Sequence, residues 1–224
     1  MNKLSREKLI KIMRELSLSY GVHELDEQAV PSYLSKVSML RFTFWRRVEL
    51  AVRVIQEKPA PRVLDFGCGL GALFPSLSQC TKEFYAYEKF PTVLASAKKL
   101  AERLEIKNVC FLENETELDE LADGSLDVIV ALDVLEHVKE LDKLLEIFHK
   151  KLNSSGRLIV CSPTEYWYYR LARKFGGEGY RGEYHEKAAD QVEEDIRRFF
   201  HVRVAARIYP ILTFFRIVTC TKKV

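Results

Sequence analysis

The spacing of apolar residues predicts helices through the first sixty residues of the chain. The first helix has one apolar face and stops before Gly21, and its apolar positions are Leu4, Leu9, Ile12, Met13 and Leu16. A second helix is predicted after Pro31. A third runs through Trp45 and ends before Pro59, because proline cannot continue a helix. We therefore expect residues 1–60 to form a helical N-terminal extension that serves as a lid.

From residue 62 the pattern changes to short apolar runs that alternate with amphipathic segments. Strands are predicted at residues 62–66, 83–88, 109–112, 126–132 and 157–162. Helices are predicted between them at residues 70–78, 93–104 and 135–152. Strands separated by helices of this length indicate a parallel sheet with helices on both faces. The continuous apolar runs of the fourth and fifth strands suit strands that are buried on both sides.

The end of the chain follows a different pattern. A helix is predicted near residues 188–200, and two strands follow at residues 202–209 and 214–221. The linker between these strands, residues 210–213, is too short for a crossover, so the two strands pair antiparallel. The expected fold is of the α/β class, with seven strands in a mostly parallel sheet and an antiparallel C-terminal hairpin.

Composition places the chain among folded globular proteins. It has 224 residues, of which 47% are hydrophobic and 30% are charged, and this excludes a disordered or collagen-like chain. Its apolar stretches are shorter than the roughly 18 residues of a membrane span, and its start lacks the apolar core of a secretory signal. The five cysteines include no CxxC pair, which favours free thiols in a reducing cytosol over disulfides or a zinc site. A cytoplasmic location is expected.

Charge is distributed unevenly, although the formal net charge is only +3. Residues 1–62 hold 12 Lys and Arg against 7 Asp and Glu, and residues 166–224 hold the same numbers. Residues 63–165 hold 11 against 18. Basic flanks around an acidic middle indicate either an anionic partner near the flanks or solvated helix faces.

The segment after the first predicted strand carries the clearest functional signal. The run of residues 65–71 reads DFGCGLG, with glycine at alternate positions. Residues without side chains let the backbone turn sharply and approach a ligand closely, and the helix that follows offers free N–H groups. The GxGxG spacing departs from the GxGxxG of dinucleotide-binding loops, which disfavours an NAD-dependent oxidoreductase. Asp65 is placed to hold a cationic amino group or an ordered water.

Glu88 ends the second predicted strand, about twenty residues after the glycine loop. A carboxylate at that place can accept hydrogen bonds from both ribose hydroxyls of a nucleoside. Alone, Glu88 reads as a surface charge and the loop as a tight turn. Their order and spacing together indicate a nucleoside site.

These motifs resemble those of the class I S-adenosylmethionine-dependent methyltransferases, whose fold is Rossmann-like. Residues 65–71 look like the family's first motif, which cradles the methionine moiety, and Glu88 matches its ribose-binding acid. Residues 114–116 align with a segment that usually reads Gly-Asp-Ala, where the Asp commonly contacts the adenine amino group. The resemblance spans roughly residues 45–223 and implies a methyltransferase domain over residues 61–224. It implies S-adenosylmethionine as cofactor, S-adenosylhomocysteine as product, and a cofactor site made of Asp65, Gly67, Cys68, Gly69, Gly71, Glu88, Lys89, Asn114, Glu115, Thr116, Leu132 and Asp133.

Two histidines are candidate bases. The sequence LEHV at residues 135–138 is similar to small-molecule methyltransferases such as the ubiquinone-biosynthesis O-methyltransferases. Methyl transfer from a sulfonium is an in-line displacement, so a base is needed only if the acceptor must lose a proton. His137 follows the fourth strand and His185 lies in a late loop, and histidine titrates near neutrality. The alternatives are a packing or capping role for His137 and an ordinary loop position for His185.

Two aromatic and basic segments, residues 40–47 and 166–175, are candidates for contact with the acceptor. They read as a lid over a hydrophobic or glycosylated acceptor, as helix cores with Arg and Lys stems along apolar surface, or as a peripheral membrane contact. We expect methyl transfer to a small or lipid-linked acceptor at oxygen, without a metal.

No appended RNA-binding module is recognisable, which argues against a nucleic-acid partner. The alternatives are an RNA methyltransferase, whose basic flanks would bind phosphate, and a non-catalytic cofactor-binding domain. The sequence does not fix the oligomeric state.

Overall fold

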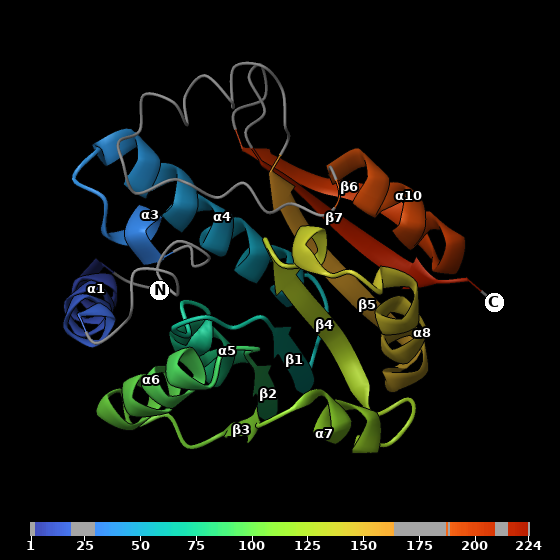
Figure 1. Cartoon of the computed structure of the whole chain (residues 1–224), viewed down its shortest axis with the longest axis horizontal. Helices are drawn as coiled ribbons and strands as arrows, with labels where there is room; N and C mark the ends of the chain where they lie inside the picture. The colour runs from blue at the N-terminus through green and yellow to red at the C-terminus, as the bar shows by residue number, and fades with distance from the viewer. Residues whose placement is uncertain (1–2, 19–29, 164–186, 188, 209–214, 224) are drawn as a thin grey trace.

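The computed structural model of the chain describes residues 3–18, 30–163, 187, 189–208 and 215–223 (Figure 1). The helices of the N-terminal part are α1 (Lys3–Ser17), α3 (Val30–Leu34) and α4 (Ser38–Gln56). The strands are β1 (Arg62–Phe66), β2 (Glu83–Tyr87), β3 (Val109–Leu112), β4 (Leu126–Leu132), β5 (Leu152–Pro163), β6 (Phe200–Ile208) and β7 (Phe215–Lys222). The remaining helical elements are α5 (Phe74–Cys80), α6 (Pro91–Arg103), α7 (Glu115–Glu120), the 3-10 turn η1 (Leu135–His137), α8 (Leu141–Lys151) and α10 (Ala189–Phe199).

Within the described residues, seven strands form one sheet in the order β3-β2-β1-β4-β5-β7-β6. The pairs from β3 to β5 are parallel, and β7 runs antiparallel to both β5 and β6. The predicted mostly parallel sheet with an antiparallel C-terminal hairpin is confirmed, although its linker, residues 210–213, lies outside the described residues. The strand order reverses between β1 and β4, which is where sheets of this type bind ligands.

Helices cover both faces of the sheet and enclose two apolar cores (Figure 1). One core joins the sheet to α1, α3, α4, α5 and α6, and the other joins it to α7, α8 and α10. Alternate residues of a strand serve opposite cores, because successive side chains of a strand point to opposite faces. In β4, Val128 and Val130 enter the first core and Ile129 enters the second. This explains the continuous apolar runs of the central strands.

A buried arginine fastens α4 to the sheet. Arg157 of β5 donates from Nη1 to the Val54 carbonyl at 3.0 Å and from Nη2 to the Ile55 carbonyl at 3.1 Å. The last carbonyls of a helix have no partner within the helix, so Arg157 caps the C-terminus of α4. Helix α4 also packs on β5, β6 and β7. The N-terminal helices are thus joined to the sheet, and a domain boundary at residue 60 stays a prediction.

The predicted continuous helix over residues 135–152 is wrong. The chain forms the short turn η1, and α8 begins only at Leu141. Leu135 and Leu141 are both buried in the same core. Six residues apart, they would point about 120° apart on a continuous helix, so the break lets both side chains reach that core.

Strand β5 begins at Leu152, five residues before the predicted start, and helices α5 and α7 also differ from the sequence pattern. Helix α5 begins at Phe74, because Gly69 and Gly71 have φ values of +52° and +80° that a right-handed helix excludes. Helix α7 is not predicted by the apolar pattern. Asn114 caps it by accepting a hydrogen bond from the Glu117 N–H at 3.1 Å. Among the helices that the structure describes, none is both long and apolar enough to cross a bilayer.

Candidate active site

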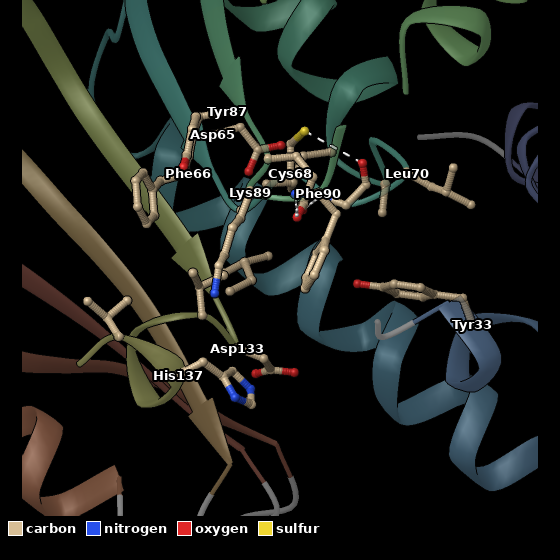
Figure 2. A pocket seen from close by; sticks show the side chains of 18 of the residues that line it. Tyr33, Asp65, Phe66, Cys68, Leu70, Tyr87, Lys89, Phe90, Asp133 and His137 are labelled. Atoms are coloured by element: carbon tan, nitrogen blue, oxygen red, sulfur yellow. Dashed lines mark hydrogen bonds between the residues drawn. The ribbon is translucent and has the colours of Figure 1, made fainter. Parts of the chain in front are cut away.

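The turn after β1 is fixed by backbone hydrogen bonds to the end of β2. The N–H groups of Gly67 and Cys68 both donate to the Tyr87 carbonyl, at 2.8 and 2.9 Å. The Gly71 N–H donates to the Cys68 carbonyl at 2.8 Å and closes the turn. The glycine loop therefore lies over the ends of β1 and β2, at the pocket shown in Figure 2.

Gly67 and Gly71 are required by the packing of the protein itself. Both have positive φ, +75° and +80°. A Cβ at Gly67 would lie 2.3 Å from Cγ2 of Val134, and a Cβ at Gly71 would lie 2.5 Å from the Phe74 ring. Only glycine meets both the backbone conformation and the space at these positions. Gly67 lines the pocket, whereas Gly71 shapes the loop from outside the lining.

Glu88 connects the glycine loop to the start of α6. The residue is only 5% exposed. Its Oε2 accepts a hydrogen bond from the Gly69 N–H at 2.9 Å, and its Oε1 accepts one from the Phe90 N–H at 3.2 Å. Because a carboxylate has about four acceptor positions, holding the loop is compatible with binding a pair of ribose hydroxyls.

Asp65 is a buried carboxyl group with an unsatisfied oxygen. It is 3% exposed, and its Oδ2 has no hydrogen-bond partner. Burial, and to a smaller extent the neighbouring charge of Glu88, raises the pKa of Asp65 to about 8. A cationic group of a ligand would give Oδ2 its partner and stabilise the ionised form.

The pocket continues toward β3 and α7. The Tyr87 ring stacks on Phe66 with centroids 5.0 Å apart, and its hydroxyl donates to Oε1 of Glu115 at 3.2 Å. Burial, and then the charge of Glu115, raises the pKa of Tyr87. Of the predicted adenine segment, Glu115 lines the pocket, whereas Asn114 and Thr116 do not.

The opposite end of the pocket forms at the exit of β4. Asp133 and His137 lie side by side there, and Lys89 extends toward them from the end of β2 (Figure 2). Asp133 has a φ of +56°, a left-handed conformation that Asp adopts more readily than most residues. Its N–H donates to the Cys161 carbonyl at 2.8 Å, which fixes it to the end of β5. Leu132 completes this wall.

The N-terminal helices close this end of the pocket. Arg47 belongs to the segment 40–47 that the sequence indicates for acceptor contact, whereas Met13 and Tyr33 are not predicted to line the pocket. Met13 of α1, Tyr33 of α3 and Arg47 of α4 line the pocket. Arg47 is 1% exposed, and its guanidinium pairs with the Asp133 carboxylate. Nη2 of Arg47 also donates to the Tyr33 hydroxyl at 2.5 Å. Three aromatic rings surround Cζ of Arg47 with centroids at 4.7 to 5.6 Å.

The helical spacing of the sequence indicates that Arg47 lies on the buried face of α4. Phe44, Val48 and Ala51 belong to the buried face of α4. Arg47 lies three residues after Phe44 and four before Ala51, so it falls on the same face. A charged residue on an apolar helix face indicates a buried partner of opposite charge. No comparable pattern marks Tyr33.

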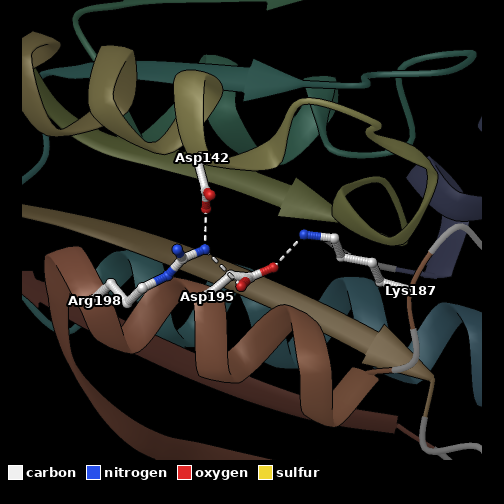
Figure 3. Close-up of polar contacts among 4 residues, drawn as sticks. All are labelled: Asp142, Lys187, Asp195 and Arg198. Atoms are coloured by element: carbon white, nitrogen blue, oxygen red, sulfur yellow. Dashed lines mark hydrogen bonds and ion pairs between the residues drawn. The ribbon is translucent and has the colours of Figure 1, made fainter.

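A charged network braces the turn η1, which carries one of the predicted bases (Figure 3). The backbone N–H of Lys187 donates to the Glu136 carbonyl at 3.3 Å, and its ammonium group pairs with Asp195 of α10. Arg198 pairs with Asp195 at 2.7 Å and also with Asp142 of α8. The Arg198 pairs join α8 to α10, and Lys187 ties the turn η1 to α10.

The structure brings most of the predicted site residues together. Those that line the pocket are Asp65, Gly67, Cys68, Gly69, Glu88, Lys89, Glu115, Leu132, Asp133 and His137. His185 and residues 166–175 lie outside the described residues. Within the described part of the chain, no three His, Cys, Asp or Glu side chains are grouped so that they could hold a metal ion.

Comparison with known proteins now identifies the family. A family described as a methyltransferase domain matches residues 40–203. The chain belongs to the class I S-adenosylmethionine-dependent methyltransferases. The solved magnesium protoporphyrin IX methyltransferase from Synechocystis, which contains S-adenosylhomocysteine, is similar with a TM-score of 0.62 and 21% identity, over 82% of this chain and 85% of that one. This likeness confirms the fold.

Two curated relatives of this methyltransferase are named for different acceptors. The small RNA 2'-O-methyltransferase of Arabidopsis thaliana is 32% identical over 138 residues, which are 53% of this chain and 14% of that protein. The ubiquinone biosynthesis O-methyltransferase of Bradyrhizobium diazoefficiens is 27% identical over 134 residues, which are 59% of this chain and 51% of that protein. The chain thus spans between 14% and about half of the length of these two relatives.

S-adenosylmethionine is the cofactor of this family, and the pocket of this methyltransferase fits it. The unsatisfied Oδ2 of Asp65 suits a cationic group. The buried carboxylate of Glu88 suits the vicinal hydroxyls of a ribose. The glycine loop exposes backbone close to the pocket, where a nucleoside with a methionine chain can lie against it.

Proposed function

We propose that this methyltransferase transfers a methyl group to the oxygen of a small or lipid-linked acceptor. The observation that carries the proposal is that the pocket has two ends, one suited to the cofactor and one left for the acceptor. Asp65 and Glu88 lie at the glycine loop, and Asp133 and His137 lie at the exit of β4. When bound, S-adenosylmethionine supplies an electrophilic methyl group on a sulfonium, and these residues orient the two reactants.

The order of the strands supports one direction for the cofactor. Glu115 follows β3, Glu88 follows β2 and the glycine loop follows β1. Adenine, ribose and methionine would therefore lie over successive strands, as expected at the carboxyl edge of such a sheet. The strand next to β1 is β4, so the acceptor side is the end that holds Leu132 and Asp133, two residues that the family resemblance assigns to the cofactor site. Lys89 lines this pocket as well and suits the methionine carboxylate.

His137 lines the pocket at the exit of β4, and this supports a role as the base that takes the proton of a hydroxyl acceptor. With S-adenosylmethionine bound, a lone pair of the acceptor oxygen would form the new O–C bond while the C–S bond breaks and its electron pair stays on sulfur. The hydroxyl proton passes to the imidazole of His137 and then to solvent. The tie of η1 to α10 through Lys187 supports this role, since a base must be held in place. His185 remains a second candidate base.

The names of the relatives support oxygen as the acceptor atom. The Arabidopsis relative is named for 2'-O-methylation of small RNA and the Bradyrhizobium relative for O-methylation in ubiquinone biosynthesis. Transfer to oxygen is common to both. RNA 2'-O-methylation is the second candidate function, favoured by the 32% identity to the Arabidopsis relative and by the basic flanks of the chain.

An apolar and basic surface at the start of α4 supports a lipid-linked acceptor and peripheral membrane contact. Three large apolar side chains there are exposed, Val37, Met39 and Phe42. Residues 28–48 contain no acidic residue, and Lys36 and Arg41 are the sequence neighbours of the exposed Val37 and Phe42. Such a surface favours an anionic bilayer. Phe42→Asp should reduce sedimentation with phosphatidylserine vesicles, while the affinity for S-adenosylhomocysteine stays unchanged.

The test of the proposed function is a radiolabelled methyl-transfer assay with two acceptors, a catechol and a short RNA duplex. We expect label in the solvent-extracted catechol and a loss of about a hundredfold in turnover for His137→Ala, with unchanged S-adenosylhomocysteine affinity. Label in RNA alone would establish the second candidate function instead. Tight cofactor binding with transfer to neither acceptor class would contradict O-methylation.

A further inference from the structure

The Arg47–Asp133 ion pair joins an N-terminal helix to the catalytic sheet inside the pocket. Arg47 of α4 is almost fully buried, and its guanidinium pairs with Oδ2 of Asp133 at the exit of β4. Nη2 of Arg47 is engaged by the Tyr33 hydroxyl at 2.5 Å. A buried charge without a partner is costly, so the position of Asp133 is coupled to that of α4.

This pairing uses only one oxygen of the Asp133 carboxylate. The second oxygen, Oδ1, is buried and has no hydrogen-bond partner. A buried acceptor atom without a donor costs free energy, and a ligand that brings a donor recovers it. The backbone holds the carboxylate in place, because Asp133 has a φ of +56° and its N–H is bonded to the Cys161 carbonyl.

We propose that Asp133 receives the hydrogen-bond donor of the acceptor at the methyl-transfer position, and that Arg47 positions it for this role. The inference rests on the proposed function, because it takes the cofactor to lie over β3, β2 and β1 with its sulfur toward β4. It deepens that function, because the acceptor hydroxyl donates its hydrogen to Oδ1 of Asp133 in the bound state and this proton passes to the neighbouring His137 as the O–C bond forms (Figure 2). The hydrogen bond to Oδ1 points the nucleophilic lone pair of the acceptor at the methyl carbon.

Sinefungin tests this without knowledge of the acceptor. It is an analogue of S-adenosylmethionine that carries an ammonium group where the cofactor carries its methyl group, and it shares the other groups of S-adenosylhomocysteine. The ratio of the two dissociation constants therefore reports only on the methyl-transfer position. Contributions of Arg47, Glu88 and the glycine loop act on both ligands and cancel in the ratio.

The measurement is calorimetric titration of the full chain with each ligand. We expect the wild type to bind sinefungin at least about tenfold more tightly than S-adenosylhomocysteine, because an ammonium donor meets a buried carboxylate. In Asp133→Asn the ratio should fall to about twofold or less, while the S-adenosylhomocysteine affinity changes less than about threefold. Asparagine adopts a left-handed backbone readily and retains an acceptor for Arg47, so the variant should keep its fold.

Asp127→Asn is the matched control, because Asp127 lies near the opposite end of β4 and binds Arg62 and Asn153 outside the pocket. It should keep the wild-type ratio. An unchanged ratio in Asp133→Asn, or a wild type without preference for sinefungin, would overturn the inference and leave the proposed function standing. A wild type that binds neither ligand would overturn the proposed function itself.

Discussion

The two halves of the pocket are built from different parts of the chain and by different interactions. The cofactor half combines the backbone of the glycine loop with the carboxyl groups of Asp65, Glu88 and Glu115. Its loop is tied to the end of β2 by hydrogen bonds of the Gly67, Cys68 and Gly69 N–H groups. The acceptor half consists of side chains from α1, α3, α4 and the β4 exit, tied by the buried Arg47–Asp133 pair. The first half tolerates little change, because its backbone conformation leaves no space for additional atoms. The second half can change its side chains while the sheet stays intact.

This difference predicts that affinity for S-adenosylhomocysteine falls most for changes at the loop and least for changes in the N-terminal helices. Four substitutions rank along this scale. Each is measured by calorimetric titration and by thermal unfolding, so that loss of binding is distinguished from loss of the fold.

Gly67→Ala should have the largest effect. The new Cβ would lie 2.3 Å from Cγ2 of Val134, at a residue with a φ of +75°. Strain and overpacking together should lower the free energy of unfolding by about 2–4 kcal/mol and the ligand affinity by more than about a hundredfold. The double variant Gly67→Ala/Val134→Ala removes the collision but not the backbone strain. It should recover part of the stability, and full recovery would show that the positive φ is unimportant.

Glu88→Gln should have the next largest effect, about a tenfold loss of affinity. The amide keeps an acceptor for the Gly69 N–H but loses the charge and one acceptor for the ribose hydroxyls. Glu83→Gln is the matched control, since Glu83 begins the same strand and binds Arg62 at 2.7 Å. Equal affinities of the two variants would contradict a ribose-binding role for Glu88.

The sequence could specify the cofactor half because its signals are local. Strand β1 and strand β4 have the predicted bounds, and the glycine spacing of the loop between Asp65 and Gly71 is visible within seven consecutive residues. Glu88 follows from its place at the end of the next strand. All of these depend on periods and spacings within about twenty-five residues, which apolar patterning records directly.

The acceptor half could not be specified in the same way because it depends on contacts between distant segments. Tyr33, Arg47 and Asp133 meet only after α4 packs across the sheet, and no spacing relates them. The break before α8 has the same origin. The period of the sequence favours one helix, and the burial of both Leu135 and Leu141 in one core overrides it.

Asp65→Asn should weaken binding by about threefold to tenfold at pH 8, and its effect on stability depends on pH. Burial and Glu88 raise the pKa of Asp65 to about 8 from the ordinary 3.8. Between pH 4 and pH 8 the unfolded chain loses this proton while the folded chain keeps it, so Asp65 costs stability that increases with pH. The variant should therefore unfold several degrees higher than the wild type at pH 8 and at the same temperature at pH 4.

The number of protons released on ligand binding gives a second test of the raised pKa of Asp65. A cationic ligand favours the ionised carboxylate, so binding near pH 7 should release up to one proton from the wild type and none from Asp65→Asn. Titrations in buffers of different ionisation enthalpy measure this number. Equal proton release from the two proteins would show that no cationic group of the ligand lies near Asp65.

Tyr33→Phe should have the smallest effect on cofactor affinity, within about threefold, because it removes one hydroxyl from the acceptor half and leaves the loop unchanged. The Arg47 Nη2 loses its partner at 2.5 Å, so the free energy of unfolding should fall by about 1–2 kcal/mol. The ring itself stays against Phe44, at a centroid distance of 5.8 Å, and against Trp45, which limits the loss. A decrease in affinity as large as that of Glu88→Gln would contradict this division of the pocket, because α3 would then belong to the cofactor half.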